Sequence, residues 1–513
     1  MLTSSGLLMP FTSNIPPKLR STVAFRTIGC RLNQCETAQM QEALRESGYE
    51  LVDWSQHADI RVVNTCTVTH KSDRTCRHEI RAAKRFDPDC LMVAAGCYAQ
   101  VDPEAVAAIE GVDLVLGNID KMRLPGHLAT LLGTLPGSHR ADGGGHHLGT
   151  EEPTGAAPHG GGAARPPVVV TPYGDHPTFH GDFFTHVYGY TRAFLKIQNG
   201  CDAHCAYCII PLARGPARSM PQAEVLEQVR LLATRGYREV VLTGIHLGKW
   251  GRDTGEGSLA DLLALLVEQG GADRYRLSSI EPLEMDEALQ DAVHRAGDRV
   301  AHHFHLPLQS GADSVLRRMG RPYTAAEYLK VAAALARRFP EAALGADVIT
   351  GFPGETDDEF EETYSFIESS PITYLHVFSY SDRPGTAACA MRPKVHVETI
   401  HERTLRLRAL GENKKEAFRG RLVGTEQRVL ILKERSTDGR LVGLTGNYVE
   451  VLVTGDELLT NHFVRMRLDR VRADGRWEGT LLEVEGPDAA GGARPAGSAL
   501  PAGAAVPPGA SAL

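Results

Sequence analysis

Three cysteines, Cys201, Cys205 and Cys208, form a CxxxCxxC motif on one short stretch of chain. Three thiolates at this spacing can bind three irons of a 4Fe-4S cluster and leave the fourth iron without a protein ligand. A structural zinc site needs a fourth ligand, which usually comes from a second Cys or His pair downstream. No such pair follows, because the next cysteine is Cys389 and it stands alone. The motif therefore favours an iron–sulfur loop with one open coordination position over a zinc site.

A second set of cysteines recurs at equivalent places in the first part of the chain. Cys30, Cys66 and Cys97 each close a short apolar, β-branched run, and each is followed by a helical pattern. The carboxyl ends of strands in an open parallel sheet meet along one edge, so we expect these cysteines to meet in space. Single buried cysteines are common as structural residues, but recurrence at the same strand-end position favours a shared metal site.

The hydrophobic pattern divides the chain into an α/β part, a second α/β part and an all-β part. Residues 22–132 alternate strand and helix patterns and predict an open parallel α/β domain. A flexible Gly/Pro/His-rich linker is predicted at 133–186. Residues 187–420 contain about six β/α units and predict an incomplete (β/α)6 barrel, with functional residues at its carboxyl strand ends. Residues 421–486 predict a small all-β barrel, and the Ala/Gly/Pro-rich tail at 487–513 is predicted to be disordered.

Composition limits the surroundings and partners of the protein. Ten cysteines without a secretory signal predict a reducing, cytoplasmic location and metal binding instead of disulfides. No apolar run approaches the ~20 residues that a membrane span needs, so no membrane association is expected. The net charge of −8 gives no overall attraction to nucleic acid, and RNA binding must come from local patches. Two basic stretches are candidates: one from Lys71 to Arg85, with Arg74, Arg77, Arg81 and Lys84, and one from Arg403 to Arg421.

The CxxxCxxC motif follows a strand-like run, Phe194–Gln198, and the pair Asn199-Gly200. In this context it resembles the radical S-adenosylmethionine (radical SAM) enzymes. The resemblance implies that the open iron binds the amino and carboxylate groups of SAM, and that an electron from the cluster cleaves SAM to a 5′-deoxyadenosyl radical. Such a radical breaks C–H bonds that acid–base chemistry does not ionise.

Both cysteine sets together resemble the methylthiotransferases, from about Val23 to Glu485. Four further segments carry the resemblance: Arg276–Pro282, His305–Gly311, Asp347–Thr356 and Phe378–Thr386. The resemblance implies an N-terminal domain with an auxiliary cluster, a radical SAM domain and a C-terminal TRAM barrel that holds RNA. It also implies two 4Fe-4S clusters, SAM as cofactor, the anticodon stem-loop of tRNA as substrate, and an electron donor such as flavodoxin or ferredoxin. The cluster ligands would be Cys30, Cys66, Cys97, Cys201, Cys205 and Cys208.

Segments Ile28–Thr37 and Asn64–Thr69 are most similar to the MtaB-type branch, which methylthiolates C2 of N6-threonylcarbamoyladenosine next to the anticodon. Two alternatives stay open: MiaB-type methylthiolation of N6-isopentenyladenosine, and a non-catalytic iron–sulfur protein that binds RNA. The chain departs from the family at Cys35, where tyrosine or aspartate is more usual. Cys35, Cys76, Cys90 and Cys389 have no partner at metal-ligand spacing and are interpreted as small apolar residues.

Several residues at predicted strand ends are expected to contact SAM. Glycines in this position let the backbone approach a ligand, although a tight turn also uses them. Polar side chains inside the mouth of a β/α barrel are seldom mere packing. The predicted SAM contacts are Thr243, Gly244, Ser279, Glu281, Gln309, Gly351 and Gly354.

Overall fold

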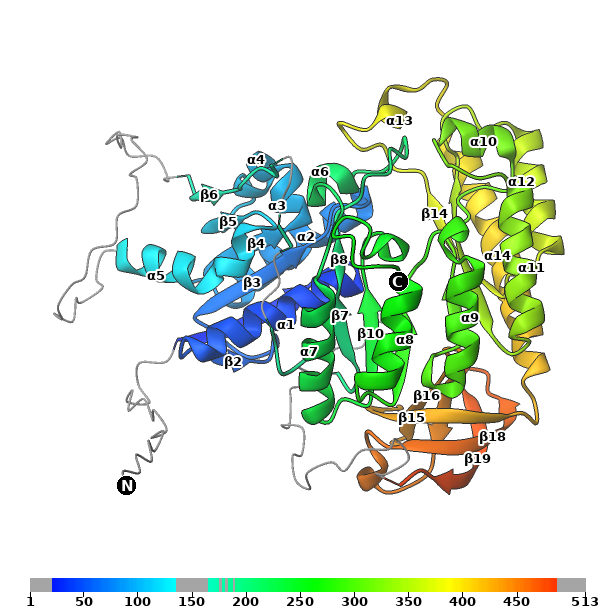
Figure 1. The fold of residues 1–513 in the computed structure, drawn as a ribbon. Helices are drawn as coiled ribbons and strands as arrows, with labels where there is room; N and C mark the ends of the chain where they lie inside the picture. Colours follow the sequence, from blue (N-terminus) through cyan, green and yellow to red (C-terminus); the bar gives the residue numbers. More distant parts are fainter. Residues whose placement is uncertain (1–20, 135–164, 175–177, 180–182, 188–189, 487–513) are drawn as a thin grey trace, which may run out of the picture.

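The structure is a computed structural model that describes residues 21–134, 165–174, 178–179, 183–187 and 190–486 (Figure 1). The tail at 487–513 lies outside these residues, and so does most of the predicted linker at 133–186. The described chain forms an open parallel α/β sheet, a set of six β/α units and a small closed β-barrel. The predicted fold class is therefore confirmed.

The N-terminal part is a six-stranded sheet in the order β2-β1-β3-β4-β5-β6, and all its pairings are parallel. One hydrophobic core lies between the sheet and α2, and another lies between the opposite face and helices α1 and α5. Strand β3 is buried at every position, as expected of a parallel strand that is covered on both faces. The elements are β1 (Thr22–Thr27), α1 (Arg31–Glu46), β2 (Glu50–Val52), β3 (Ile60–Thr65), α2 (His70–Phe86), β4 (Leu91–Gly96), α3 (Cys97–Val101), α4 (Pro103–Ala107), β5 (Leu114–Leu116) and α5 (Leu124–Thr134).

The sheet gains an edge strand inside the segment that the sequence predicts to be a flexible linker. Strand β6 (Val168–Val169) pairs in parallel with β5, and Phe184 is completely buried. The prediction of a linker over all of 133–186 therefore differs from the structure at both ends of this segment. The composition of the whole segment, rich in Gly and Pro, predicts a linker, but the segment also contains a short Val-Val-Val run. Such a run can add to an open sheet edge by backbone pairing alone.

The central part consists of six β/α units, as predicted. Two three-stranded parallel sheets, β11-β10-β7 and β12-β13-β14, are joined through an isolated bridge between Tyr275 and Val300. Among the described residues no pairing joins β7 to β14, so the barrel is incomplete. The strands are β7 (Ala193–Lys196), β10 (Glu239–Thr243), β11 (Arg274–Leu277), β12 (His303–His305), β13 (Ala343–Thr350) and β14 (Tyr374–Ser379); the short pair β8 (Gln198–Asn199) and β9 (Arg218–Ser219) lies beside them.

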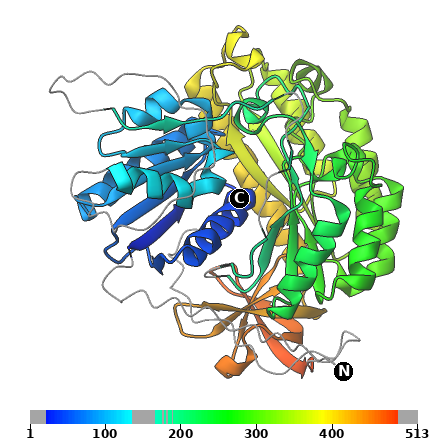
Figure 2. The same cartoon turned by 60° about the vertical axis from the view of Figure 1, so that its left-hand side comes forward.

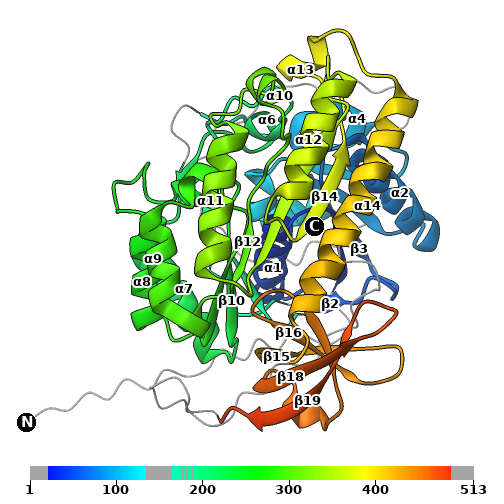
Figure 3. The same cartoon turned by 90° about the vertical axis from the view of Figure 1, so that its right-hand side faces the viewer.

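Helices cover the outside of these strands, and Figure 3 shows α11, α12 and α14 over β12 and β14. Capping boxes at Ser258, Thr324 and Thr356 begin α8, α11 and α12, because each side chain accepts the N–H three residues on. The helices are α6 (Ile210–Arg214), α7 (Gln222–Thr234), α8 (Leu259–Gln269), α9 (Glu287–Ala296), α10 (Asp313–Arg318), α11 (Ala325–Arg338), α12 (Asp357–Ser369), α13 (Ala387–Ala390) and α14 (Val397–Arg421).

The open side of the barrel faces the N-terminal part, and α1 packs against β7 (Figure 2). Cys35 and Ala38 of α1 are buried in the same hydrophobic core as Ala193 and Leu195 of β7. The first domain therefore covers one side of the barrel opening and shares its core.

The C-terminal part is a closed five-stranded barrel in the order β15-β16-β17-β19-β18 around the buried Trp477. It docks at the amino ends of the central strands: Arg274 and Arg276 of β11 donate to the carbonyls of Leu444 and Gly446 (3.0 and 2.9 Å). The carboxyl strand ends are thus left free for a site. The strands are β15 (Glu426–Arg435), β16 (Leu441–Thr445), β17 (Glu450–Val453), β18 (Phe463–Val471) and β19 (Trp477–Val484).

Candidate active site

The CxxxCxxC loop, residues 201–208, leaves the carboxyl end of the first central strands and leads into α6. Its turn is held by hydrogen bonds from Ala203 N–H to the Cys201 sulfur (3.4 Å) and from Cys208 N–H to the Cys205 carbonyl (3.0 Å). Burial, reinforced by the nearby thiols of Cys205 and Cys201, raises the pKa of the Cys208 thiol to about 12. The motif therefore converges three sulfurs on one small volume, and a bound metal would displace their protons.

Two side chains that the sequence did not single out contact these sulfurs. His246, after β10, has its Nδ1 3.4 Å from the Cys201 sulfur and its Nε2 2.7 Å from Glu284. Burial opposes its charged form, but Cys201 and Glu284 raise the pKa of His246 to about 9. Arg321 donates to the Cys205 sulfur (3.2 Å). Three soft ligands with cationic neighbours fit an anionic iron–sulfur cluster.

Cys30, Cys66 and Cys97 follow β1, β3 and β4, which are neighbours in the sheet. Burial, with the thiols of Cys97 and Cys30 close by, raises the pKa of the Cys66 thiol to about 12. Gly29 has a φ of +101°, and a Cβ there would lie 2.8 Å from the Cys66 sulfur, so only glycine lets the Cys30 turn approach so closely. The structure thus brings together the three strand-end cysteines; their role as ligands stays a prediction.

A buried charge cluster lies beside these cysteines. The carboxylate of Glu36 on α1 is contacted by Lys121 (2.7 Å), Lys196 (3.1 Å) and Arg214 (2.9 Å), and all four side chains are at most 2% exposed. Within the described residues, Lys121 and Arg214 alone already outnumber this one carboxylate, which Lys196 also contacts. Such an excess is unfavourable unless an anion compensates it. A cluster on Cys30, Cys66 and Cys97 would supply that anion, so the residues present fit it.

The residues predicted to contact SAM all lie at the carboxyl ends of central strands. Thr243 ends β10, and Ser279 and Glu281 follow β11. Gln309 follows β12 and has a φ of 69°, a left-handed conformation that is uncommon outside glycine. The remaining predicted contacts are Gly244, Gly351 and Gly354.

Some of these residues also have partners within the protein. Glu281 forms an ion pair with Arg321, which places it beside the CxxxCxxC loop. A Cβ on Gly351 would lie 2.2 Å from Ile400 of α14, so helix packing is by itself a reason for glycine there. Gly354 has a φ of 75°, and the nearest atom to an added Cβ is 3.9 Å away. At Gly354 only the positive φ favours glycine, whereas at Gly351 the close approach of Ile400 also excludes a side chain.

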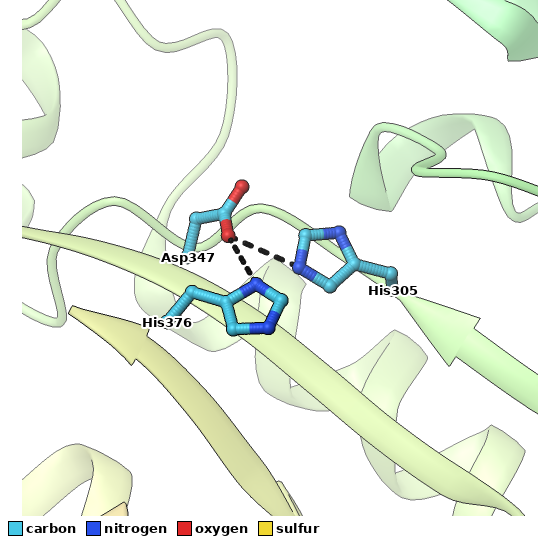
Figure 4. A group of neighbouring side chains, drawn as sticks. All are labelled: His305, Asp347 and His376. Atoms are coloured by element: carbon cyan, nitrogen blue, oxygen red, sulfur yellow. Dashed lines mark hydrogen bonds and ion pairs between the residues drawn. The ribbon is translucent and has the colours of Figure 1, made fainter. Parts of the chain in front are cut away.

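Inside the barrel, His305, Asp347 and His376 meet from β12, β13 and β14 (Figure 4). One oxygen of Asp347 lies 3.1 Å from His305 Nε2 and 3.2 Å from His376 Nδ1. Burial alone would raise the pKa of the Asp347 carboxyl, but the two imidazoles hold it well below its usual value. His305 Nδ1 is also 2.7 Å from Ser279 Oγ. The lumen therefore presents a carboxylate and imidazoles beside a predicted SAM contact.

Of the cysteines interpreted as apolar residues, Cys35, Cys76 and Cys90 are buried, whereas Cys389 is partly exposed. Cys35 is completely buried, accepts the Lys196 N–H (3.3 Å), and burial raises the pKa of its thiol to about 12. Cys76 donates to the Cys66 carbonyl (3.4 Å). No disulfide is present among the ten cysteines, all of which are in the described part of the chain.

The two basic stretches differ in exposure. On α2, four of the six cations are exposed, namely Lys71, Arg74, Arg81 and Arg85. On α14, Arg403 is buried against Glu355 (2.6 Å), Arg406 pairs with Glu361 and Lys414 donates to backbone carbonyls. The expectation of a second RNA-binding stretch is thus weakened, because Arg403, Arg406 and Lys414 are engaged with α12 and the turn before it. No helix in the described ranges is long and apolar enough to cross a bilayer.

Comparison with known proteins gives two family matches. Residues 22–117 match an uncharacterized protein family, UPF0004, and residues 195–367 match the radical SAM superfamily. A threonylcarbamoyladenosine tRNA methylthiotransferase MtaB of Aquifex aeolicus is 38% identical, over 84% of this chain and 96% of its own length. The Bacillus subtilis protein of the same name is 36% identical, over 87% and 94%. A tRNA-2-methylthio-N(6)-dimethylallyladenosine synthase of Cereibacter sphaeroides is 32% identical, over 86% and 94%.

Proposed function

Because the chain belongs to the radical SAM tRNA methylthiotransferase family and is thus a transferase, we propose that it methylthiolates C2 of N6-threonylcarbamoyladenosine next to the anticodon of tRNA. The observation that carries the proposal is the pair of cysteine triads, one at the carboxyl strand ends of the N-terminal part and one at those of the central part. One triad serves the radical reaction and the other holds the sulfur to be transferred. The site of action is the cytoplasm, where tRNA is modified.

The proposal requires two 4Fe-4S clusters and two SAM molecules per turnover. Bound at Cys201, Cys205 and Cys208, a cluster with SAM supplies the radical chemistry that breaks an aromatic C–H bond. Arg321 and His246 orient and compensate these sulfurs. Lys121 and Arg214, which contact Glu36, compensate the charge of Cys97, and Arg214 also that of Cys30. Flavodoxin or ferredoxin is the proposed electron donor.

The second candidate is methylthiolation of an isopentenyl- or dimethylallyl-type adenosine. The Cereibacter sphaeroides relative keeps it open. Two features support the threonylcarbamoyl substrate: the Asn64–Thr69 segment, and the 38% and 36% identity to two relatives that carry that name.

The test uses the reconstituted, reduced full-length protein with two anticodon stem-loop RNAs. One carries N6-threonylcarbamoyladenosine and the other N6-isopentenyladenosine. Nucleoside mass spectrometry should show a methylthio product from the first RNA only. A product from the isopentenyl RNA alone would assign the chain to the other branch. Release of 5′-deoxyadenosine without product from either RNA would contradict both.

A further inference from the structure

A group of cations gathers where the three parts of the chain meet. Arg31 follows Cys30 in the N-terminal part, Arg192 precedes β7, and Tyr448 lies in the turn between β16 and β17 of the small barrel. Arg31 donates to the Tyr448 hydroxyl (2.6 Å), and the Arg192 guanidinium lies 5.6 Å from the centre of the Tyr448 ring. Arg276 lies 5.0 Å from the same ring. Three guanidinium groups therefore surround one phenol.

The carboxylates near this group in the described residues do not balance its three arginines. Glu239 is the carboxylate close to it, and Arg274 and Arg276 already occupy Glu239 (2.5 and 2.9 Å). Arg192 Nη1 is buried, has no hydrogen-bond partner in the described ranges and lies 3.5 Å from Glu239. No carboxylate in the described part of the chain forms an ion pair with Arg31. The positive potential is strong enough that, against the effect of burial, the arginines lower the pKa of Tyr448 to about 8.

The backbone holds Tyr448 in an unusual conformation at this point. Its φ is 67°, which tyrosine rarely adopts, and the Thr445 hydroxyl accepts the next N–H (2.8 Å) to keep the turn. Tyr448 nevertheless stays 37% exposed. A residue in this conformation whose side chain is still partly open to solvent points to a ligand contact.

A row of rings leads from Tyr448 into the barrel. Tyr448 stacks on His303 (4.7 Å between ring centres), and His303 stacks on Tyr374 (5.8 Å). Tyr374 contacts His376 (5.4 Å), which lies against His305 (5.2 Å) in the group of Figure 4. Rings of this kind provide stacking surfaces for a base taken out of an RNA loop. An adenine in the lumen would thus have a cationic pocket at the end of the row.

We propose that Arg31, Arg192 and Tyr448 bind the carboxylate of the adenosine's N6 substituent and so select an acidic over a neutral substituent. The inference rests on the proposed function, since the threonylcarbamoyl group carries a carboxylate and an isopentenyl group carries none. Guanidinium groups bind a carboxylate by paired N–H donors, and the phenol adds one O–H donor. Arg276 is a positioning residue, because its donors are taken up by Glu239 and the turn carbonyls.

The experiment measures the affinity of the full-length, reconstituted protein for three anticodon stem-loop RNAs. They carry adenosine, N6-threonylcarbamoyladenosine, or the methyl ester of the latter, which keeps the size of the group and removes its charge. The wild-type protein should bind the acid at least roughly tenfold more tightly than the ester. Arg31→Gln and Arg192→Gln should each remove most of this preference and leave the affinity for the ester unchanged.

Two results would overturn the proposal. Equal affinity of the wild-type protein for acid and ester would show that the carboxylate is not bound, and this comparison needs no variant to fold. If the Arg variants lost affinity equally for all three RNAs, the arginines would bind a phosphate of the RNA backbone and not the carboxylate. Arg230→Gln, an exposed arginine of α7, is the matched control and should change nothing.

A different result would contradict the proposed function. If the wild-type protein gives no product from the threonylcarbamoyl RNA but modifies the isopentenyl RNA, the branch assignment is wrong. If it modifies acid and ester with equal KM, the function stands and the carboxylate site is wrong.

Discussion

Cys30 and Cys35 stand close in the sequence but in different surroundings. Cys30 is exposed at the start of α1, whereas Cys35 is completely buried against β7. The sequence alone assigned Cys30 by its place after a strand, and that place is what the structure has. The sequence did not predict the Glu36 charge cluster, because the partners of Glu36 lie 85, 160 and 178 positions away in the chain. Only tertiary packing brings them together.

We predict that Cys30→Ala, Cys66→Ala and Cys97→Ala each lose about half of the iron and all methylthio product, but still release 5′-deoxyadenosine. The reason is that each triad holds its own cluster. Cys35→Ser should keep both clusters and nearly normal product. Iron, sulfide and product mass check this.

Cys205→Ala is the reciprocal control and should keep half of the iron without cleaving SAM. If Cys35→Ser lost a cluster while Cys30→Ala kept both, the ligand set would have to be exchanged.

Lys121→Met should lower the reduction potential of the auxiliary cluster. It removes one of three buried cations, and a less positive surrounding stabilises the reduced, more negative cluster less. A redox titration followed by electron paramagnetic resonance measures the shift. Lys330→Met, at an exposed lysine of α11, is the control and should leave the potential unchanged. A potential equal to wild type in Lys121→Met would mean that the charge cluster is structural only.

At the level of elements, the six central strands could be predicted because each is a short apolar run followed by a helical pattern. The sequence predicts strands at Tyr275–Ile280 and Ala301–Leu308, but β11 ends at Leu277 and β12 covers only His303–His305. Beyond His305 the chain leaves the ladder, and Gln309 turns with a positive φ. Strand β6 was not predicted, because two residues that pair only along an edge carry too little pattern.

The docking of the small barrel on β11 leads to a prediction at this scale. A chain ending at Arg421 should melt at lower temperature than the full chain, because the guanidinium groups of Arg274 and Arg276 lose their carbonyl acceptors on the barrel. A hydrogen bond from a charged group contributes about 1.5–3 kcal/mol to stability. The same chain should bind tRNA more weakly. Differential scanning calorimetry and an RNA binding assay test both, with a chain ending at Gly486 as control. An unchanged melting temperature would show that the barrel is an independent unit.

For the whole molecule, a net charge of −8 means that tRNA is attracted by local surfaces only. The exposed cations of α2 form the clearest such surface, since Arg403, Arg406 and Lys414 of α14 have partners within the protein.

We therefore predict that Arg74→Glu with Arg81→Glu weakens tRNA binding and reduces its dependence on salt, because fewer counterions are released. Binding titrations at several salt concentrations measure the slope. Arg408→Glu on α14 is the comparison and should have the smaller effect. If Arg408→Glu weakened tRNA binding more than the α2 variant, tRNA would bind along α14 instead.

The hydrogen bond between Arg31 and Tyr448 joins positions 417 residues apart. During synthesis on the ribosome, the cysteine-bearing domain emerges first and the turn that carries Tyr448 emerges nearly last. Both cysteine triads are present in the nascent chain well before that turn. A polypeptide that ends before this turn would therefore contain both cysteine triads but lack Tyr448, and with it the complete pocket to which we assign substrate selection.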